Sequence, residues 1–150
     1  IYTMKYGDRP DIATHLGKVV AGEFSPHGFF EDIDLIHPLP LHPARRRQRG
    51  YNQSCEFAYG ISAVTDIPVA DDIIVRTRNT KSQTLMSPTQ RAGNMVGAFA
   101  VKHPERLKGK HVLLVDDILT TGASLGACIE VLAKVDDVRV SFLTIGKTLD

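Results

Sequence analysis

The chain has few cysteines, almost no net charge and no long apolar segment. Its two cysteines, Cys55 and Cys128, lie far apart and in no C-x-x-C arrangement. The formal net charge of +1 gives no overall attraction to nucleic acid or to an anionic membrane. No signal-peptide pattern and no run of about 18 apolar residues occurs. These absences predict a reduced, cytoplasmic protein without a membrane span, in which anion binding depends on local clusters.

Two common kinds of site are also missing. No G-x-x-x-x-G-K-[ST] pattern occurs, because each Gly-Lys pair lacks the upstream glycine and the following Ser or Thr, so a P-loop enzyme is excluded. The histidines show no H-x-x-x-H spacing. His37, His42 and His111 are therefore predicted to be packing or surface residues and not zinc ligands.

What the chain does have is enough apolar sequence for one domain spanning residues 1–150, since 43% of it is hydrophobic. Because it begins at Ile1 without a methionine, we expect it to be a fragment. Helical and strand patterns alternate, which predicts an α/β fold with a central, mainly parallel sheet flanked by helices. The expected helices are 8–24, 52–64 and 124–134, and the expected strands are 33–39, 73–76, 97–101, 111–115 and 138–145.

The segment HVLLVDDILTTGAS, residues 111–124, carries the clearest chemical signal. Its aliphatic run is typical of a strand buried on both faces, so Asp116 and Asp117 are expected at the strand's carboxyl end. Two adjacent carboxylates there can accept hydrogen bonds from vicinal hydroxyls. A solvated strand end, a Walker B carboxylate or a receiver-domain pocket would be the alternatives, but the missing P-loop and the short remaining chain argue against the last two.

The five small residues that follow are predicted to bind a phosphate. They are Thr120, Thr121, Gly122, Ala123 and Ser124. Backbone N–H groups at a helix N-terminus attract anions, and small side chains let a phosphate approach them. A simple turn and helix cap would explain only part of this cluster.

A basic run, Arg45, Arg46, Arg47 and Arg49, follows the expected strand 33–39. Such a run is more often a solvated face than a site. If strands 33–39 and 111–115 are neighbours, these guanidinium groups can reach a pyrophosphate and bind it in bidentate fashion. Contact with a DNA or RNA phosphate is the competing interpretation, for which the net charge gives little support.

Residues 79–94 form a long stretch with little apolar periodicity, which predicts a functional loop.

Three blocks of the chain resemble a known family. Residues 112–124 are similar to the phosphoribosyl-pyrophosphate (PRPP) motif of type I phosphoribosyltransferases. PLPLHPARRRQRGYNQ at 38–53 and QTLMSPTQRAGNMVGAF at 83–99 resemble blocks of the ComF family within that fold.

The resemblance implies a phosphoribosyltransferase that binds PRPP with Mg²⁺ bridged by the ligand, and that transfers the phosphoribosyl group to a nitrogen acceptor with release of pyrophosphate. By family position, Asp116 and Asp117 would be the catalytic carboxylates and residues 120–124 would hold the 5-phosphate. The pyrophosphate would contact Leu39, Pro40, Arg45, Arg47 and Arg49, and a mobile loop containing Gln83, Arg91 and Asn94 would cover the site.

The family also implies an N-terminal cysteine-rich segment outside this chain, and dimers are common among similar proteins. The sequence does not identify the acceptor base. A non-catalytic module that binds PRPP or a nucleotide in a competence, DNA-uptake or repair pathway is the alternative function, because it would use the same phosphate loop.

Overall fold

A computed structural model describes residues 9–77 and 97–148, without the side chains of Pro43, Arg45 and Arg49. Its α-helices are α2 (Pro10–Phe24), α3 (Pro43–Arg49), α4 (Gln53–Thr65) and α6 (Ala123–Leu132), with short 3-10 helices at Ser25–His27 and Pro104–Arg106. Its strands are β1 (Leu35–Pro38), β2 (Ile74–Arg76), β3 (Phe99–Val101), β4 (His111–Leu119) and β5 (Arg139–Lys147). None of the described helices is long and apolar enough to cross a membrane.

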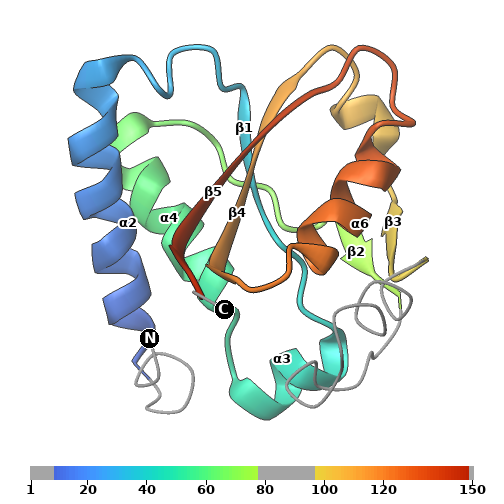
Figure 1. Cartoon of the computed structure of the whole chain (residues 1–150), viewed down its shortest axis with the longest axis horizontal. Coiled ribbons are helices and arrows are strands. Elements are labelled where there is room, and N and C mark those ends of the chain that lie inside the picture. Colours follow the sequence, from blue (N-terminus) through green and yellow to red (C-terminus); the bar gives the residue numbers. More distant parts are fainter. Residues whose placement is uncertain (1–8, 78–96, 149–150) are drawn as a thin grey trace.

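The central sheet is parallel and has the strand order β1-β4-β5. Helices α2 and α4 lie on one side of it, and α6 with β2 and β3 lies on the other (Figure 1). The side chains of consecutive β4 residues pack on opposite faces of the sheet. Leu113 and Val115 pack with α2 and α4, whereas Val112 and Leu114 pack with α6. The continuous aliphatic pattern of this strand therefore arises because both faces are covered.

Strands β2 and β3 do not join the parallel sheet, contrary to the expectation from the alternating pattern. They pair with each other in antiparallel fashion, with Val75 opposite Ala100. Within residues 9–77 and 97–148, the other edge of β1 has one isolated bridge, a parallel one between Ile36 and Val69. Ile74 and Phe99 are buried in the same apolar cluster as α6, so this pair covers one face of the central sheet.

The end of β1 determines where β4 loses its strand neighbour on one side. Pro38 lies opposite Val115 in the last register pair, and the next residue, Leu39, donates its N–H to the Val115 carbonyl oxygen over 2.8 Å. The chain then enters α3, which lies at the end of the sheet where the parallel strands finish (Figure 1). From Asp116 onward β4 is paired with β5 only. The carboxylates predicted from the sequence thus stand where one side of β4 has no strand neighbour.

Helices α2 and α4 cross at two glycines. A Cβ atom on Gly17 would lie 2.3 Å from the Phe57 carbonyl oxygen, and one on Gly60 would lie 2.1 Å from the Thr14 carbonyl oxygen. Only glycine permits so close an approach of two helix backbones. The Thr14 hydroxyl also donates to the Glu56 carboxylate over 3.2 Å. Helix α4 is thereby held tightly between α2 and the sheet.

Candidate functional site

Asp116 and Asp117 occur inside β4 and not after its end, because the strand continues to Leu119. The expected strand 111–115 was therefore too short. Asp116 Oδ1 accepts two hydrogen bonds, from the Ser54 hydroxyl over 3.0 Å and from the Asp117 N–H over 2.9 Å. Asp117 Oδ1 accepts the N–H of Ile118 over 2.8 Å. Both side chains are partly buried and are oriented by neighbouring donors.

The electrostatics of this pair favour a proton on Asp116. Burial, and secondly the charge of Asp117, raise the pKa of Asp116 to about 7, while the hydrogen bond from Ser54 acts in the opposite direction. Beneath the pair, burial and then the charge of Asp116 raise the pKa of the Cys128 thiol to about 12. Perturbed carboxyl groups of this kind are frequent at functional sites, although buried structural networks also produce them.

The loop after β4 leads directly into α6. Thr120 and Thr121 are exposed, and Gly122 adopts a left-handed conformation with φ of 77°. Helix α6 then begins at Ala123, one residue earlier than the sequence pattern predicted. Its N-cap residue, Gly122, has no side chain to cap it, and the Thr121 hydroxyl accepts the Ala123 N–H over 3.4 Å. The N–H groups of a helix's first turn have no intrahelical partner and carry partial positive charge. The predicted phosphate loop therefore has the local geometry of an anion site.

The predicted pyrophosphate residues lie at the end of β1 and in α3. The Leu39 N–H is already bonded to Val115, and Pro40 has none, so neither offers a main-chain donor. Residues 45–49 belong to α3, a helix that the sequence analysis did not predict. Arg47 is exposed on α3, whereas the side chains of Arg45 and Arg49 lie outside the described residues. The roles of these residues remain predictions, as do those of Gln83, Arg91 and Asn94, which also lie outside them.

Three buried polar residues make bonds in this region that the sequence reasoning did not foresee, although it did expect His37 to be a packing or surface residue. Ser54, in the first turn of α4, bonds Asp116. Asn52 precedes α4 and bonds the Leu39 carbonyl oxygen over 3.3 Å. His37 is fully buried; its Nδ1 lies 2.8 Å from the Pro38 carbonyl oxygen and its Nε2 accepts the Ile74 N–H over 3.1 Å. The polar start of a helical pattern at Asn52 was the only sequence signal for any of them.

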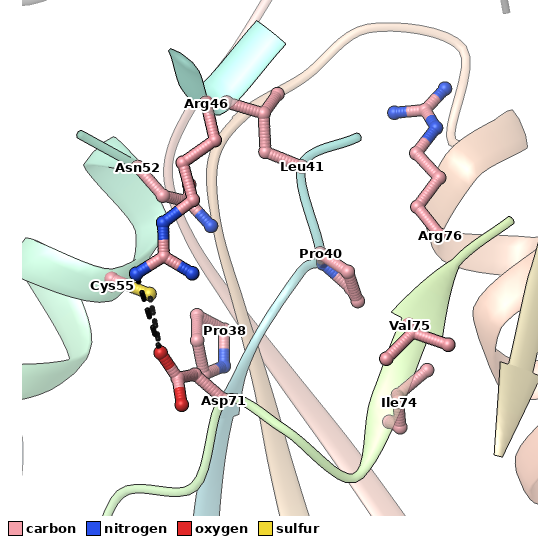
Figure 2. A pocket seen from close by; sticks show the side chains of 10 residues that line it. All are labelled: Pro38, Pro40, Leu41, Arg46, Asn52, Cys55, Asp71, Ile74, Val75 and Arg76. Carbon is pink, nitrogen blue, oxygen red and sulfur yellow. Dashed lines mark hydrogen bonds and ion pairs between the residues drawn. The ribbon is translucent and has the colours of Figure 1, made fainter. Parts of the chain in front are cut away.

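A pocket of about 180 Å³ lies between the ends of β1 and β2 and the first turn of α4. Figure 2 shows Arg46 and Asn52 on one side of it and Arg76 on the other, with the prolines of β1 and its following loop between them. Arg46 forms an ion pair with Asp71 at 3.8 Å. The Cys55 thiol, 4.0 Å from the Asp71 carboxylate, has its pKa raised to about 12 by burial and secondly by that charge. This thiol is therefore unsuited to act as a nucleophile.

No group of three or more His, Cys, Asp or Glu side chains within the described part of the chain could hold a metal ion. Asp116 and Asp117 are two carboxylates, too few for a Mg²⁺ site made by protein alone. Mg²⁺ is commonly held by one or two carboxylates together with water and the phosphates of a substrate. The pair thus fits an ion that is bridged by a bound phosphate ester.

Comparison with known proteins agrees with this arrangement. A family model described as the phosphoribosyl transferase domain matches residues 52–145. Competence protein F of Haemophilus influenzae is 33% identical across 71% of this chain and 48% of its own length. DNA utilization protein YhgH of Escherichia coli K12 is 27% identical across 99% of this chain and 66% of its own. The chain thus spans about half to two thirds of these relatives.

Among solved structures, the glutamine PRPP amidotransferase from B. subtilis has a TM-score of 0.58 at 19% identity, over 88% of this chain and 25% of that one. A hypoxanthine phosphoribosyltransferase from Staphylococcus aureus has a TM-score of 0.52 at 14% identity, over 93% and 65%. At these identities the likeness concerns the fold, and it confirms the predicted α/β class. With its carboxylates and small-residue loop inside the matched segment, the chain belongs to the phosphoribosyl transferase domain family, among relatives of the ComF type.

Proposed function

We propose that this domain binds PRPP together with Mg²⁺ and transfers the phosphoribosyl group to a nitrogen acceptor, releasing pyrophosphate. The observation that carries the proposal is the continuity of β4, the loop and α6. It joins a carboxylate pair to the N-terminus of a helix within nine residues, Asp116 to Ser124. A pentose 5-phosphate carries both vicinal hydroxyls and a dianion, the groups that these two features can bind.

Each part of this segment has a separate task in the proposed reaction. Asp116 and Asp117 would accept hydrogen bonds from the ribose hydroxyls, and the loop from Thr120 to Ser124 would donate N–H groups to the 5-phosphate. Arginines of α3 would attract the pyrophosphate. Displacement at ribose C1 develops positive charge in the ring, so the nearby carboxylates would stabilise it by their position and charge. The leaving group takes the electron pair of the broken C1–O bond.

When bound, Mg²⁺ would neutralise charge on the pyrophosphate as it departs. The two carboxylates would support it through ribose hydroxyls or water.

The buried and unpaired state of Cys55 and Cys128 accords with the cytoplasmic location that the sequence predicts.

A second candidate function is favoured by the names of the relatives. Competence protein F and DNA utilization protein YhgH point to DNA handling, in which PRPP or a nucleotide would be bound as a signal and not consumed. The same carboxylates and loop would then serve binding alone. The two candidates differ only in whether pyrophosphate is released.

Calorimetric titration of PRPP with and without Mg²⁺ tests the shared part of both candidates. We expect saturable, Mg²⁺-dependent binding by the wild type and its loss in an Asp116→Asn, Asp117→Asn double variant. Absence of wild-type binding would refute both candidates. Incubation of PRPP with a panel of purine, pyrimidine and pyridine bases then separates them, since pyrophosphate release marks the enzyme.

A binding assay with single-stranded DNA at several salt concentrations tests whether the arginines of α3 bind nucleic acid. Affinity that falls steeply with salt and survives the double substitution would identify nucleic acid as a ligand of α3 instead.

A further inference from the structure

The buried polar side chains of the described residues are concentrated in one place. They are His37, Asn52, Gln53 and Ser54, of which none is more than 9% exposed. Burying polar groups costs free energy unless each finds a partner, so cores usually contain few of them. All four lie at the end of β1 or at the start of α4, where the expected ligand site is. One of them, Asn52, bonds the first residue of the loop after β1, residues 39–42.

Asn52 makes two contacts that join the start of α4 to the loop after β1. Its Oδ1 accepts the N–H of Ser54 over 3.1 Å and so caps α4, while its Nδ2 donates to the carbonyl oxygen of Leu39 over 3.3 Å. Leu39 is also tied to β4 through its own N–H. The first residue of the loop is therefore fixed on one side by the sheet and on the other by α4.

The same turn of α4 also reaches the carboxylate pair. Two residues after Asn52, the Ser54 hydroxyl donates to Asp116. One helical turn thus contacts both the loop after β1 and the carboxylate assigned to the ribose. In Figure 2, Asn52 lies between Cys55 and Leu41, beside the pocket that borders the loop.

We propose that Asn52 is a positioning residue that holds the loop at 39–42, and with it the start of α3, at a fixed place relative to Asp116, so that a ligand carrying a pyrophosphate at ribose C1 is bound in preference to one without it. This inference rests on the proposed function. It assigns to Asn52 a role in selecting between ligands that share the 5-phosphate.

A simple helix cap is the competing explanation for Asn52, and one substitution separates the two. Serine is as good an N-cap as asparagine, but its side chain is too short to reach the Leu39 carbonyl. Asn52→Ser therefore keeps the cap, keeps the charge and removes only the tether. Asn52→Asp is the second variant: it keeps both the size and the cap, and it replaces the donor by an acceptor.

The experiment compares two ligands, PRPP and ribose 5-phosphate, in equilibrium titrations at one Mg²⁺ concentration. We expect Asn52→Ser to weaken PRPP binding about tenfold, on the scale of one buried hydrogen bond, because ligand binding would then have to order the released loop and the start of α3. Binding of ribose 5-phosphate should change less than twofold, because that ligand lacks the pyrophosphate that the proposed function assigns to the arginines of α3. Asn52→Asp should show the same selectivity with a larger loss.

Circular dichroism and a thermal melt establish that each variant is folded. Equal weakening of both ligands, or no change for either, would overturn the positioning role. If the wild type binds ribose 5-phosphate but gains nothing from the pyrophosphate of PRPP, the inference fails while the 5-phosphate site stands. If the wild type binds neither, the proposed function itself fails.

Discussion

Replacing Asp116 by asparagine should make the protein more stable, although it removes a residue central to the proposed site. Burial raises the pKa of this carboxyl group to about 7 in the folded protein, against an ordinary value of 3.8. Between these values the folded protein keeps a proton that the unfolded chain has lost. The stability of the wild type must therefore fall as the pH rises through this window.

The size of the effect follows from the shift. About three pKa units at roughly 1.4 kcal/mol each amount to on the order of 4 kcal/mol at pH 8, which is an upper value. An asparagine cannot ionise, and its Oδ1 can still accept from Ser54 and from the Asp117 N–H. We expect Asp116→Asn to raise the free energy of unfolding by roughly 2–4 kcal/mol at pH 8 and by little at pH 4.

Urea denaturation at several pH values measures this difference directly. The matched control is Asp32→Asn, which changes an exposed carboxylate in a loop and should leave stability within about 0.5 kcal/mol. A gain of equal size at pH 4 and pH 8 would show that packing and not charge is responsible. No gain at pH 8 would refute the argument from burial.

Three further predictions concern other parts of the molecule. Gly17→Ala should lower the free energy of unfolding by at least about 3 kcal/mol, because the added methyl group forces α2 away from α4. Gly22→Ala places a methyl group that meets nothing within 4 Å, so it should be neutral or slightly stabilising. Thermal melts of both variants test this ranking, and the opposite ranking would contradict it. His37→Phe should cost about 2–4 kcal/mol by unpairing two backbone groups. Burial lowers the pKa of His37 below its ordinary value of 6.5, so the wild type should also lose stability as the pH falls below 6.5. If His37→Phe loses stability with acid to the same extent, this explanation is contradicted. Finally, Cys55 and Cys128 should react with a thiol reagent at pH 8 at least about a hundredfold more slowly in the native protein than in denaturant, and comparable rates would disprove their burial.

The parts of the fold that the sequence predicts are those with strong local patterns. The aliphatic run before Asp116 identified β4, and apolar spacing identified α2, α4 and α6 to within a few residues. Helix α3 was missed because its seven residues are almost all polar, so it has no apolar face to reveal a helical period. Its signals were a proline at its first position and a glycine after its last.

The pairing of β2 with β3 could not be predicted for a different reason. Both strands are three residues long, and their patterns do not say which edge they join. Contacts between distant segments decide that question. The same limit applies to the site: the carboxylates and the phosphate loop are contiguous in sequence, but the bonds from Asn52 to Leu39 and from Ser54 to Asp116 join positions that only the fold brings together.

The crossing of α2 and α4 sets the smallest piece of this protein that can fold. The segment matched by the family model begins at residue 52, so it leaves out α2 and β1. A protein trimmed to that segment would uncover the face of α4 around Gly60 and would turn β4 into an edge strand. It would carry the recognisable motif without the helix that keeps Asn52 and Ser54 in place. Expression boundaries for this domain should therefore be drawn N-terminal to Pro10, outside the segment that the family model matches.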